Sequence, residues 1–279
     1  MIRENDRAAL LYWDAIAGAW RIPPPLSPSA EDVLWFENNT GCLEMDPPPA
    51  PAALLLGVTP AIANMRWPRD TSLVAIDWSQ GMLQSVWARP EGRVWAEAVR
   101  ADWRAMPLRT ASRDVAVGDG CYTALGSYEN AARTNAEIRR VLCDHGLFCL
   151  RAFVRPDRPE AVEGLFGELA QGSVSNLDLF RWRLAMAVQG SSRGGVRLSE
   201  VWRCWSEHIG DRRSLAERHG WPDSARRNIE RWRDVEMRYY FPSLAELHAL
   251  AAPCFEVVSC EIPGYEWGER FPRIVMRAR

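Results

Sequence analysis

The sequence predicts an α/β protein with a doubly wound, mostly parallel sheet that closes in an antiparallel hairpin. Between residues 52 and 154, short apolar segments alternate with stretches whose apolar residues recur at helical spacing. This alternation is typical of repeated strand–helix–strand units in a parallel sheet. Residues 255–262 and 273–278 form two more apolar segments near the end of the chain. The loop between them is too short for a crossover helix, so we expect these two segments to pair antiparallel.

Length and composition fit a globular protein. The chain has 279 residues, enough for one large α/β domain or two small ones. Hydrophobic residues make up 47% and charged residues 25%, the usual globular balance. The 34 basic and 36 acidic residues give a net charge of −2, which argues against an obligate polyanion binder but leaves a nucleic-acid partner open through local patches. No apolar run is long enough for a membrane span and the first residues are charged, so we expect a cytoplasmic protein with no membrane partner.

The cysteine and histidine positions predict no metal site. The seven cysteines form no Cys-x-x-Cys pair, and the four histidines are scattered along the chain. Every basic residue is Arg, and there are 14 Trp residues. Codon usage in a G- and C-rich genome accounts for this bias; an aromatic, guanidinium-rich pocket for a planar or anionic ligand is the functional alternative.

Residues 1–50 are predicted to form an N-terminal helical cap. Apolar residues at helical spacing over 3–20 indicate an amphipathic helix, which the prolines at 23–25 end. Ser29 and Asp32 have the spacing of a capping box, so a second short helix should begin there. Three aromatic residues of the first helix either pack on a helix face or line a substrate pocket: Tyr12, Trp13 and Trp20.

Residues 51–171 and 241–279 are predicted to form the α/β core. Five strand candidates lie in the first part, at residues 54–56, 73–76, 96–100, 115–117 and 147–153. Helices are predicted at residues 80–89, 130–144 and 243–251. Over residues 172–240 the alternation gives way to helical patches rich in Trp and Arg. We expect this segment to be a helical insertion between the fifth and sixth strands, lying over the active site.

Ligands bind an open parallel sheet beyond the carboxyl ends of its strands, and these ends carry distinctive residues here. Gly57 follows the first strand in a tight turn. Asp77 ends the second strand about 20 residues later, where a carboxylate can accept hydrogen bonds from a ribose diol. Asp102 and Trp103 follow the third strand, as an acceptor for an adenine amino group beside an indole able to stack on the ring. The glycines of residues 118–120 permit close backbone approach to a ligand after the fourth strand.

This series resembles the class I S-adenosylmethionine-dependent methyltransferases, best over residues 52–154. Residues 77–83, with the sequence Asp-Trp-Ser-Gln-Gly-Met-Leu, look like the ribose-binding stretch of that family, and Asp102 with Pro107-Leu108 looks like its adenine-binding stretch. Residues 136–142 look like its helix before the fifth strand. The resemblance implies a seven-stranded sheet with an antiparallel last strand, S-adenosylmethionine across the carboxyl edge, and methyl transfer to an acceptor held above it.

The resemblance also implies which residues contact the cofactor. They are Gly57, Val58, Thr59, Asp77, Trp78, Met82, Asp102, Trp103, Gly118, Asp119 and Gly120. The sequence departs from the family at the glycine-rich turn, which keeps only Gly57, and at residues 144–146, where Asp-His-Gly replaces the frequent Pro-Gly-Gly. We expect His145 in a helix C-terminal turn, with no chemical role.

Each candidate also has a structural interpretation. Asp77 and Asp102 can be helix N-caps, and the indoles that follow them can be core aromatics. Cys121 and Tyr122 stand just beyond the fourth strand, where the family's acceptor approaches. They are weak catalytic candidates or structural residues.

Methyl transfer to a small-molecule acceptor is the function that the sequence favours. One alternative is a non-catalytic S-adenosylmethionine-binding regulatory protein, because the glycine turn is eroded. Another is an RNA-directed methyltransferase, because residues 181–183 and 231–233 both read Arg-Trp-Arg and could stack on bases. Such motifs more often belong to a Trp-packed helix with solvated Arg. A nicotinamide oxidoreductase would share the sheet, but residues 57–62 lack its Gly-x-Gly-x-x-Gly turn.

Overall fold

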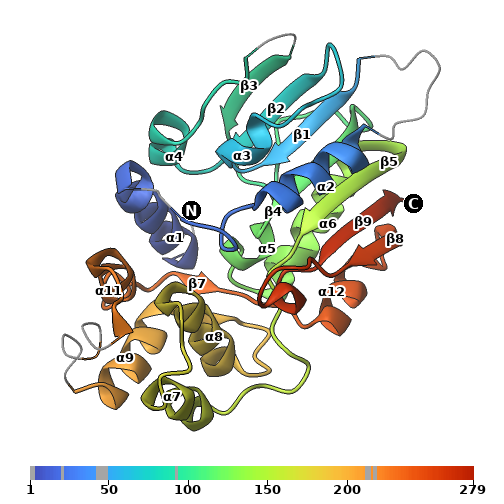
Figure 1. The fold of residues 1–279 in the computed structure, drawn as a ribbon. Helices are drawn as coiled ribbons and strands as arrows, with labels where there is room; N and C mark the ends of the chain where they lie inside the picture. Colours follow the sequence, from blue (N-terminus) through green and yellow to red (C-terminus); the bar gives the residue numbers. More distant parts are fainter. Residues whose placement is uncertain (1–3, 20–21, 42–49, 92–93, 211–214, 216–218) are drawn as a thin grey trace.

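A computed structural model describes residues 4–19, 22–41, 50–91, 94–210, 215 and 219–279 (Figure 1). Its main sheet has seven strands in the order β3-β2-β1-β4-β5-β9-β8. They are β1 (Ala52–Leu56), β2 (Ser72–Asp77), β3 (Trp95–Arg100), β4 (Arg113–Asp119), β5 (Leu142–Arg151), β8 (Phe255–Glu261) and β9 (Arg273–Ala278). The first five pair in parallel, and β9 runs antiparallel to both β5 and β8. The predicted fold class is confirmed.

Alternate residues of the central strands build two cores, one on each face of the sheet. The helices of this part are α2 (Ala30–Thr40), α3 (Pro60–Ala63), α4 (Gln80–Ser85), α5 (Cys121–Ala124), α6 (Tyr128–Val141) and α12 (Leu244–Ala251). Leu54 and Leu56 of β1 pack with residues of α6 and α12, whereas Ala53 and Leu55 pack with residues of α2, α3 and α4. Because successive strand residues point to opposite faces, the continuous apolar run of β1 is what a strand covered on both sides requires.

The N-terminal segment contributes α1 (Glu4–Ile16), the short 3-10 helix η1 (Ala17–Ala19) and α2. The predicted capping box of α2 is present, because Asp32 N donates to Ser29 Oγ at 3.2 Å and Ser29 N donates to Asp32 Oδ2 at 2.9 Å. Trp20 and residues 42–49 lie outside the described part of the chain.

A second, helical lobe follows β5. It contains α7 (Val162–Ala170), α8 (Leu177–Gln189), α9 (Leu198–His208), α11 (Asp223–Glu230) and the two-stranded sheet of β6 (Val196–Arg197) and β7 (Arg238–Tyr239). Its own core includes Phe180, Trp205, Ile229 and Trp232, which are at most 1% exposed. Leu165 and Leu169 of α7 join this core, so the helical lobe begins before residue 172. Neither α7 nor the small sheet was expected from the sequence.

Gly195 joins this lobe to the sheet domain. Its φ is +67°, and a Cβ atom there would lie 2.3 Å from the Tyr239 carbonyl oxygen and 2.4 Å from that of Gly126. Three backbone segments therefore meet at a point that only glycine can occupy.

Two predicted helices are shorter than expected. The helix predicted at 80–89 ends at Ser85, and the one predicted at 130–144 ends at Val141. His145 is therefore not in a helix C-terminal turn. It has a φ of +64° in an irregular part of β5, where pairing with β4 shifts from Arg113–Leu142 to Val115–Leu147. Leu142 already pairs in the sheet, so the residues that follow it bulge out of the strand. No helix among the described residues is long and apolar enough to cross a membrane.

Candidate functional site

A cavity of about 860 Å³ lies at the carboxyl ends of the parallel strands. The chain passes from β1 to β2 on one side and from β4 to β5 on the other, so β1 and β4 flank the switch point of the sheet. Open α/β sheets bind their ligands in the crevice at this point. Side chains from α1 and from the helical lobe complete the lining, which joins three parts of the chain around one space.

Most of the predicted cofactor residues meet in this cavity. Those that line it are Gly57, Val58, Thr59, Asp77, Trp78, Met82, Asp102, Trp103, Asp119 and Gly120. Gly118 does not line it. A Cβ atom on Gly118 would lie 2.9 Å from Cys121 Sγ, so this glycine makes room for a buried thiol. The prediction that Gly118 contacts the cofactor therefore finds no support in the lining of this cavity.

Gly57 and Asp77 face each other across the ends of β1 and β2. Gly57 has a φ of +92°, and its N–H donates to the Ile76 carbonyl at 2.7 Å. A Cβ atom on Gly57 would lie 3.9 Å from Asp77 Oδ2 and 3.6 Å from Trp103 Cζ2. The glycine keeps the space between this carboxylate and this indole free of a side chain.

The carboxylate of Asp77 is held by backbone N–H groups. Its Oδ1 accepts a hydrogen bond from Ser79 N at 2.8 Å, and the backbone N–H of Trp78 also interacts with the carboxylate. Burial raises the pKa of Asp77 to about 6, the nearby charge of Asp14 adds to the rise, and the Ser79 hydrogen bond opposes it. The N-cap of α4 is Ser79, whose Oγ accepts from Met82 N at 3.1 Å. Asp77 is therefore not a helix cap.

Asp102 differs from the free carboxylate that the sequence suggested. Both of its oxygens accept hydrogen bonds from Arg104, with a shortest distance of 2.7 Å, and Arg104 also reaches Asp6 of α1 at 3.0 Å. The same guanidinium lies 5.5 Å from the ring centroid of Trp78. An adenine amino group would therefore add a hydrogen bond to an existing ion pair. Arg104 is only two residues from Asp102, so sequence reasoning missed a local partner. Spacing along the chain could not show the contact of Arg104 with Asp6, 98 residues away in α1.

Aromatic side chains form the opposite wall. Phe153 and Trp182 meet edge to face with ring centroids 4.8 Å apart, and Tyr239 lies 5.5 Å from Trp182. All three line the cavity, as does Trp13 of α1. Tyr12, also predicted for this pocket, does not line the cavity; its hydroxyl accepts a hydrogen bond from Trp232 Nε1 at 3.1 Å and ties α1 to the helical lobe.

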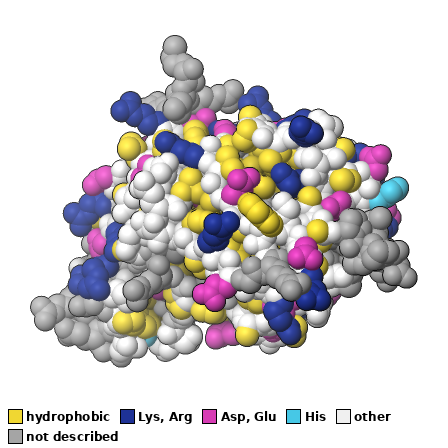
Figure 2. Space-filling model, turned by 90° about the horizontal axis from the view of Figure 1, so that it is seen from above, with side chains coloured by type: hydrophobic (Ala, Val, Ile, Leu, Met, Phe, Trp, Pro, Cys, Tyr) yellow, Lys and Arg dark blue, Asp and Glu magenta, His cyan; other side chains and the backbone are white. Residues whose placement is uncertain are grey.

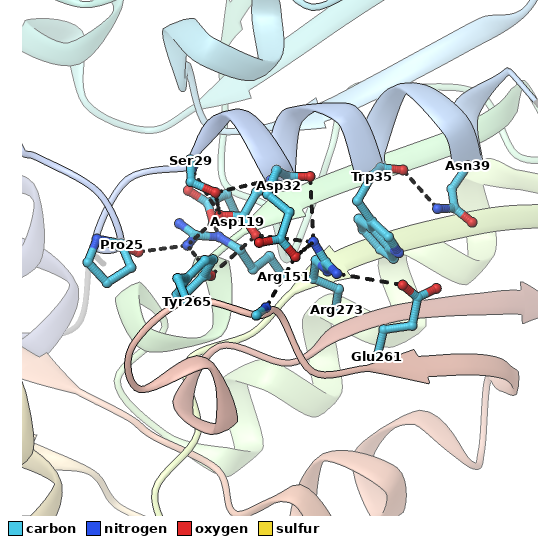
Figure 3. A network of polar contacts seen from close by, with 12 residues as sticks. Pro25, Ser29, Asp32, Trp35, Asn39, Asp119, Arg151, Glu261, Tyr265 and Arg273 are labelled. Atoms are coloured by element: carbon cyan, nitrogen blue, oxygen red, sulfur yellow. Dashed lines mark hydrogen bonds and ion pairs between the residues drawn. The ribbon is translucent and has the colours of Figure 1, made fainter.

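Asp119 is held by a buried arginine that sequence reasoning missed (Figure 3). Arg151, fully buried at the end of β5, donates from Nε to Asp119 Oδ1 at 2.6 Å. Its Nη1 donates to the Pro25 carbonyl at 2.7 Å and to Asp32 Oδ2 at 3.3 Å. Burial raises the pKa of Asp119, and the charge of Arg151 opposes this rise. An Arg in the apolar run of β5 was the one available sign of such a site.

Neither weak catalytic candidate has the environment of a reactive group. Cys121 lines the cavity, but burial raises the pKa of its thiol, so it is not a thiolate near neutral pH. Tyr122 points into the core, where its hydroxyl donates to Asn135 Oδ1 at 2.5 Å. The described residues include no group of three or more His, Cys, Asp and Glu that could hold a metal ion.

Arg181 and Arg183 of the first Arg-Trp-Arg motif are engaged inside the protein, whereas Arg231 and Arg233 of the second are exposed. Arg181 lies 4.5 Å from the ring centroid of Trp232, and Arg183 pairs with Glu160 and Glu168. Arg233 lies 4.8 Å from the Trp202 ring centroid. On the face shown in Figure 2, basic and acidic side chains are interspersed, with hydrophobic side chains between them. These observations favour the structural interpretation of the motifs.

Comparison with known proteins gives a family match and a set of structural matches. Residues 57–150 match a family model described as a methyltransferase domain. A candidate zinc-dependent alcohol dehydrogenase from Rhodobacter sphaeroides superposes with a TM-score of 0.58 at 13% identity, over 98% of each chain. A candidate exported protein from Bordetella parapertussis gives a TM-score of 0.50 at 13% identity, over 99% of this chain and 83% of its own.

The N-methyltransferase NodS from Bradyrhizobium japonicum WM9, in complex with S-adenosyl-L-homocysteine, gives a TM-score of 0.49 at 8% identity, over 97% of this chain and 98% of its own. At such low identities, structural similarity shows the fold alone. No curated protein sequence matches the chain.

Proposed function

The chain belongs, through residues 57–150, to the class I S-adenosylmethionine-dependent methyltransferases, and from this premise we propose that it methylates a small-molecule acceptor inside the cavity. The observation that carries the proposal is the convergence of Gly57, Asp77 and Asp102 on one crevice at the switch point of the sheet. Each of the three comes from the end of a different strand or the turn after it.

The residues present fit S-adenosylmethionine. Asp77 lines the cavity, and its carboxylate has several acceptor positions, so it can accept a ribose hydroxyl beside its backbone hydrogen bonds. Gly57 leaves the neighbouring space open at a φ of +92°, which suits close approach of a ligand to the backbone. Asp102 stands next to Trp103 on the adjoining strand end, where an adenine would find an acceptor and an indole. The Trp103 indole is fixed by its own hydrogen bond from Nε1 to the Ile76 carbonyl at 2.6 Å.

The bound cofactor would supply a methyl group that is already electrophilic, so the protein mainly has to orient the acceptor and exclude water. Trp13, Phe153, Trp182 and Tyr239 provide apolar walls for this purpose. Helix α1 covers the sheet edge through the ion pair of Asp6 with Arg104. These side chains can orient the acceptor and exclude water from the cavity, and the reaction then needs no strong base.

The size of the cavity supports a small acceptor. A space of about 860 Å³ falls within the range of small-molecule sites and suits a cofactor with one modest second ligand. Arg181 and Arg183 are engaged inside the protein, which weakens the feature that favoured RNA. Tight, steeply salt-dependent binding of single-stranded RNA would contradict this part of the proposal.

Calorimetric titration with S-adenosylhomocysteine tests the cofactor site. We expect binding to the wild type, and binding weaker by about 10- to 100-fold in Asp77→Ala, since about 1.5–3 kcal/mol is lost with each hydrogen bond to a charged group. Glu97→Ala is the matched control, because it removes an exposed carboxylate from the neighbouring strand β3. Preferential binding of NAD by the wild type, or unchanged affinity in a folded Asp77→Ala, would contradict the proposal.

A further inference from the structure

We propose that Arg104 is a positioning residue that couples cofactor binding to the docking of helix α1. One guanidinium holds both Asp102, the acceptor proposed for the adenine, and Asp6 of α1. The inference rests on the function proposed above and adds to it a residue that acts through these two carboxylates. Its consequence is that the bound cofactor and the docked helix each stabilise the other.

The backbone places Arg104 against Asp102. Asp102 Oδ1 accepts the N–H of Arg104 at 2.8 Å, and Ala105 N donates to the Asp102 carbonyl at 3.0 Å, so the chain turns back after β3. Within this turn the Arg104 side chain reaches both carboxylate oxygens, with Nε at 2.9 Å from Oδ1 and Nη2 at 2.7 Å from Oδ2. Two donors on two oxygens fix the plane of a carboxylate as well as its position. Asp102 is therefore held in one orientation at the cavity wall, and its carboxylate can accept a further hydrogen bond there.

The rest of the guanidinium reaches two helices. Its Nη1 donates to Asp6 Oδ1 of α1 at 3.0 Å and to Asn130 Oδ1 of α6 at 3.2 Å. The side chain of Arg104 is 13% exposed and that of Asp6 is 17% exposed, so water and salt screen this pair less than a surface pair. One positive charge therefore joins α1, α6 and the turn after β3.

Helix α1 forms one wall of the cavity next to this charge. Four of its residues recur at helical spacing and line the cavity from one face of the helix: Asp6, Ala9, Leu10 and Trp13. With α1 docked, this face closes one side of the cavity and Arg104 holds both of its carboxylates. Because the wall and the fixed carboxylate of Asp102 are complete only in this state, a cofactor binds it more tightly. By reciprocity, cofactor binding favours the docking of α1.

The charges explain why this coupling depends on Arg104. In the described part of the chain, no other basic side chain pairs with Asp6 or with Asp102. Without the guanidinium, two carboxylates would face each other between α1 and the edge of the sheet, and like charges at short range repel. A lysine would keep the positive charge, but its compact ammonium lacks the planar fork that reaches two carboxylates at once. The guanidinium shape, as well as its charge, therefore matters here.

Amide hydrogen exchange of α1, measured with and without saturating S-adenosylhomocysteine, tests the coupling. We expect the ligand to slow exchange across α1 by about tenfold or more in the wild type, and by about threefold or less in Arg104→Gln and in Asp6→Ala. Arg109→Gln is the matched control, because it removes an exposed arginine from the same loop and should behave as the wild type does. Equal slowing in the wild type and the two variants, or no slowing in the wild type, would overturn the proposal.

Calorimetry with S-adenosylhomocysteine tests the fork. We expect binding weaker by about tenfold or more in Arg104→Gln, and by about threefold or more in Arg104→Lys and in Asp6→Ala. Asp6→Ala leaves the pair of Arg104 with Asp102 intact, so it tests the coupling independently of any folding defect in Arg104→Gln. Wild-type affinity in Arg104→Lys would show an effect of net charge only, and wild-type affinity in Asp6→Ala would show that α1 is not coupled to the cofactor; either result overturns the proposal. A wild type that does not bind S-adenosylhomocysteine would instead contradict the proposed function.

Discussion

Asp14 of helix α1 accepts a hydrogen bond from the Ser79 hydroxyl, with 2.5 Å between the two oxygens. The same carboxylate oxygen accepts the N–H of Gly81 at 2.8 Å. Ser79 in turn donates its N–H to Asp77. The helix over the cavity and the carboxylate proposed to hold the ribose are therefore fixed by one short segment of chain.

Removing the Asp14 carboxylate should loosen α1. In Asp14→Ala, the loss of two hydrogen bonds at a solvent-exposed residue should lower the free energy of unfolding by about 1–2 kcal/mol. Amide hydrogen exchange over α1 should become faster, while the strands keep their protection. Arg7→Ala on the exposed side of the same helix is the control and should change neither quantity. Unchanged exchange in α1 would show that Asp14 does not hold it.

Cofactor affinity should depend on pH through Asp77. Burial raises the pKa of this carboxyl to about 6, and ribose hydroxyls donate to its ionised form. Below that pH the carboxyl must lose a proton before it binds, so affinity for S-adenosylhomocysteine should be about tenfold weaker at pH 5 than at pH 7. The charge of Asp14 contributes to the raised pKa, so Asp14→Ala should shift the transition to lower pH. Calorimetry across this range checks both, and Asp77→Asn, which does not titrate, should show a flat profile.

Gly195 should be intolerant of a side chain. Gly195→Ala places a Cβ atom within 2.4 Å of two carbonyl oxygens at a positive φ, so we expect a loss of more than about 2 kcal/mol in the free energy of unfolding. Gly164→Ala is the matched control, since a Cβ there meets nothing within 4 Å in helix α7 and should stabilise by about 0.5–1 kcal/mol. Urea denaturation measures both. Equal stabilities for the two variants would contradict the three-segment junction.

Tyr122 should matter for stability and not for ligand binding. Tyr122→Phe leaves the buried Asn135 Oδ1 without its donor, which should cost about 1–3 kcal/mol of unfolding free energy. Its affinity for S-adenosylhomocysteine should stay within about twofold of wild type. A large loss of affinity with unchanged stability would instead show that Tyr122 takes part in ligand binding.

The sheet and the first half of the site followed from local pattern. The apolar runs of β1, β2 and β4 could be identified because strands buried on both faces need nothing but apolar residues. Asp77 and Asp102 could be placed together because the carboxyl ends of parallel strands share one edge. Both inferences need only the order of residues along the chain.

The distant polar partners of these residues could not be predicted. Arg104 lies only two residues from Asp102, but its second partner, Asp6 of α1, is 98 residues away. Arg151 pairs with both Asp119 and Asp32, and Asp32 lies in α2, 119 residues before Arg151. Such contacts depend on how distant elements pack, and spacing along the chain carries no record of that. Helix α7 was not predicted for the same reason, because its apolar residues are buried only where they pack in the core with α8 and α9.

The anchoring of α1 sets an order of events during synthesis. Its partners Ser79, Arg104 and Trp232 follow their α1 contacts by 65, 98 and 220 residues. A ribosome releases the chain from the N-terminus at a modest rate. The helix that is made first therefore gains the last of these anchors only after Trp232 has emerged. The cavity, whose lining includes Trp182 and Tyr239 of the helical lobe, is complete only when that lobe has folded.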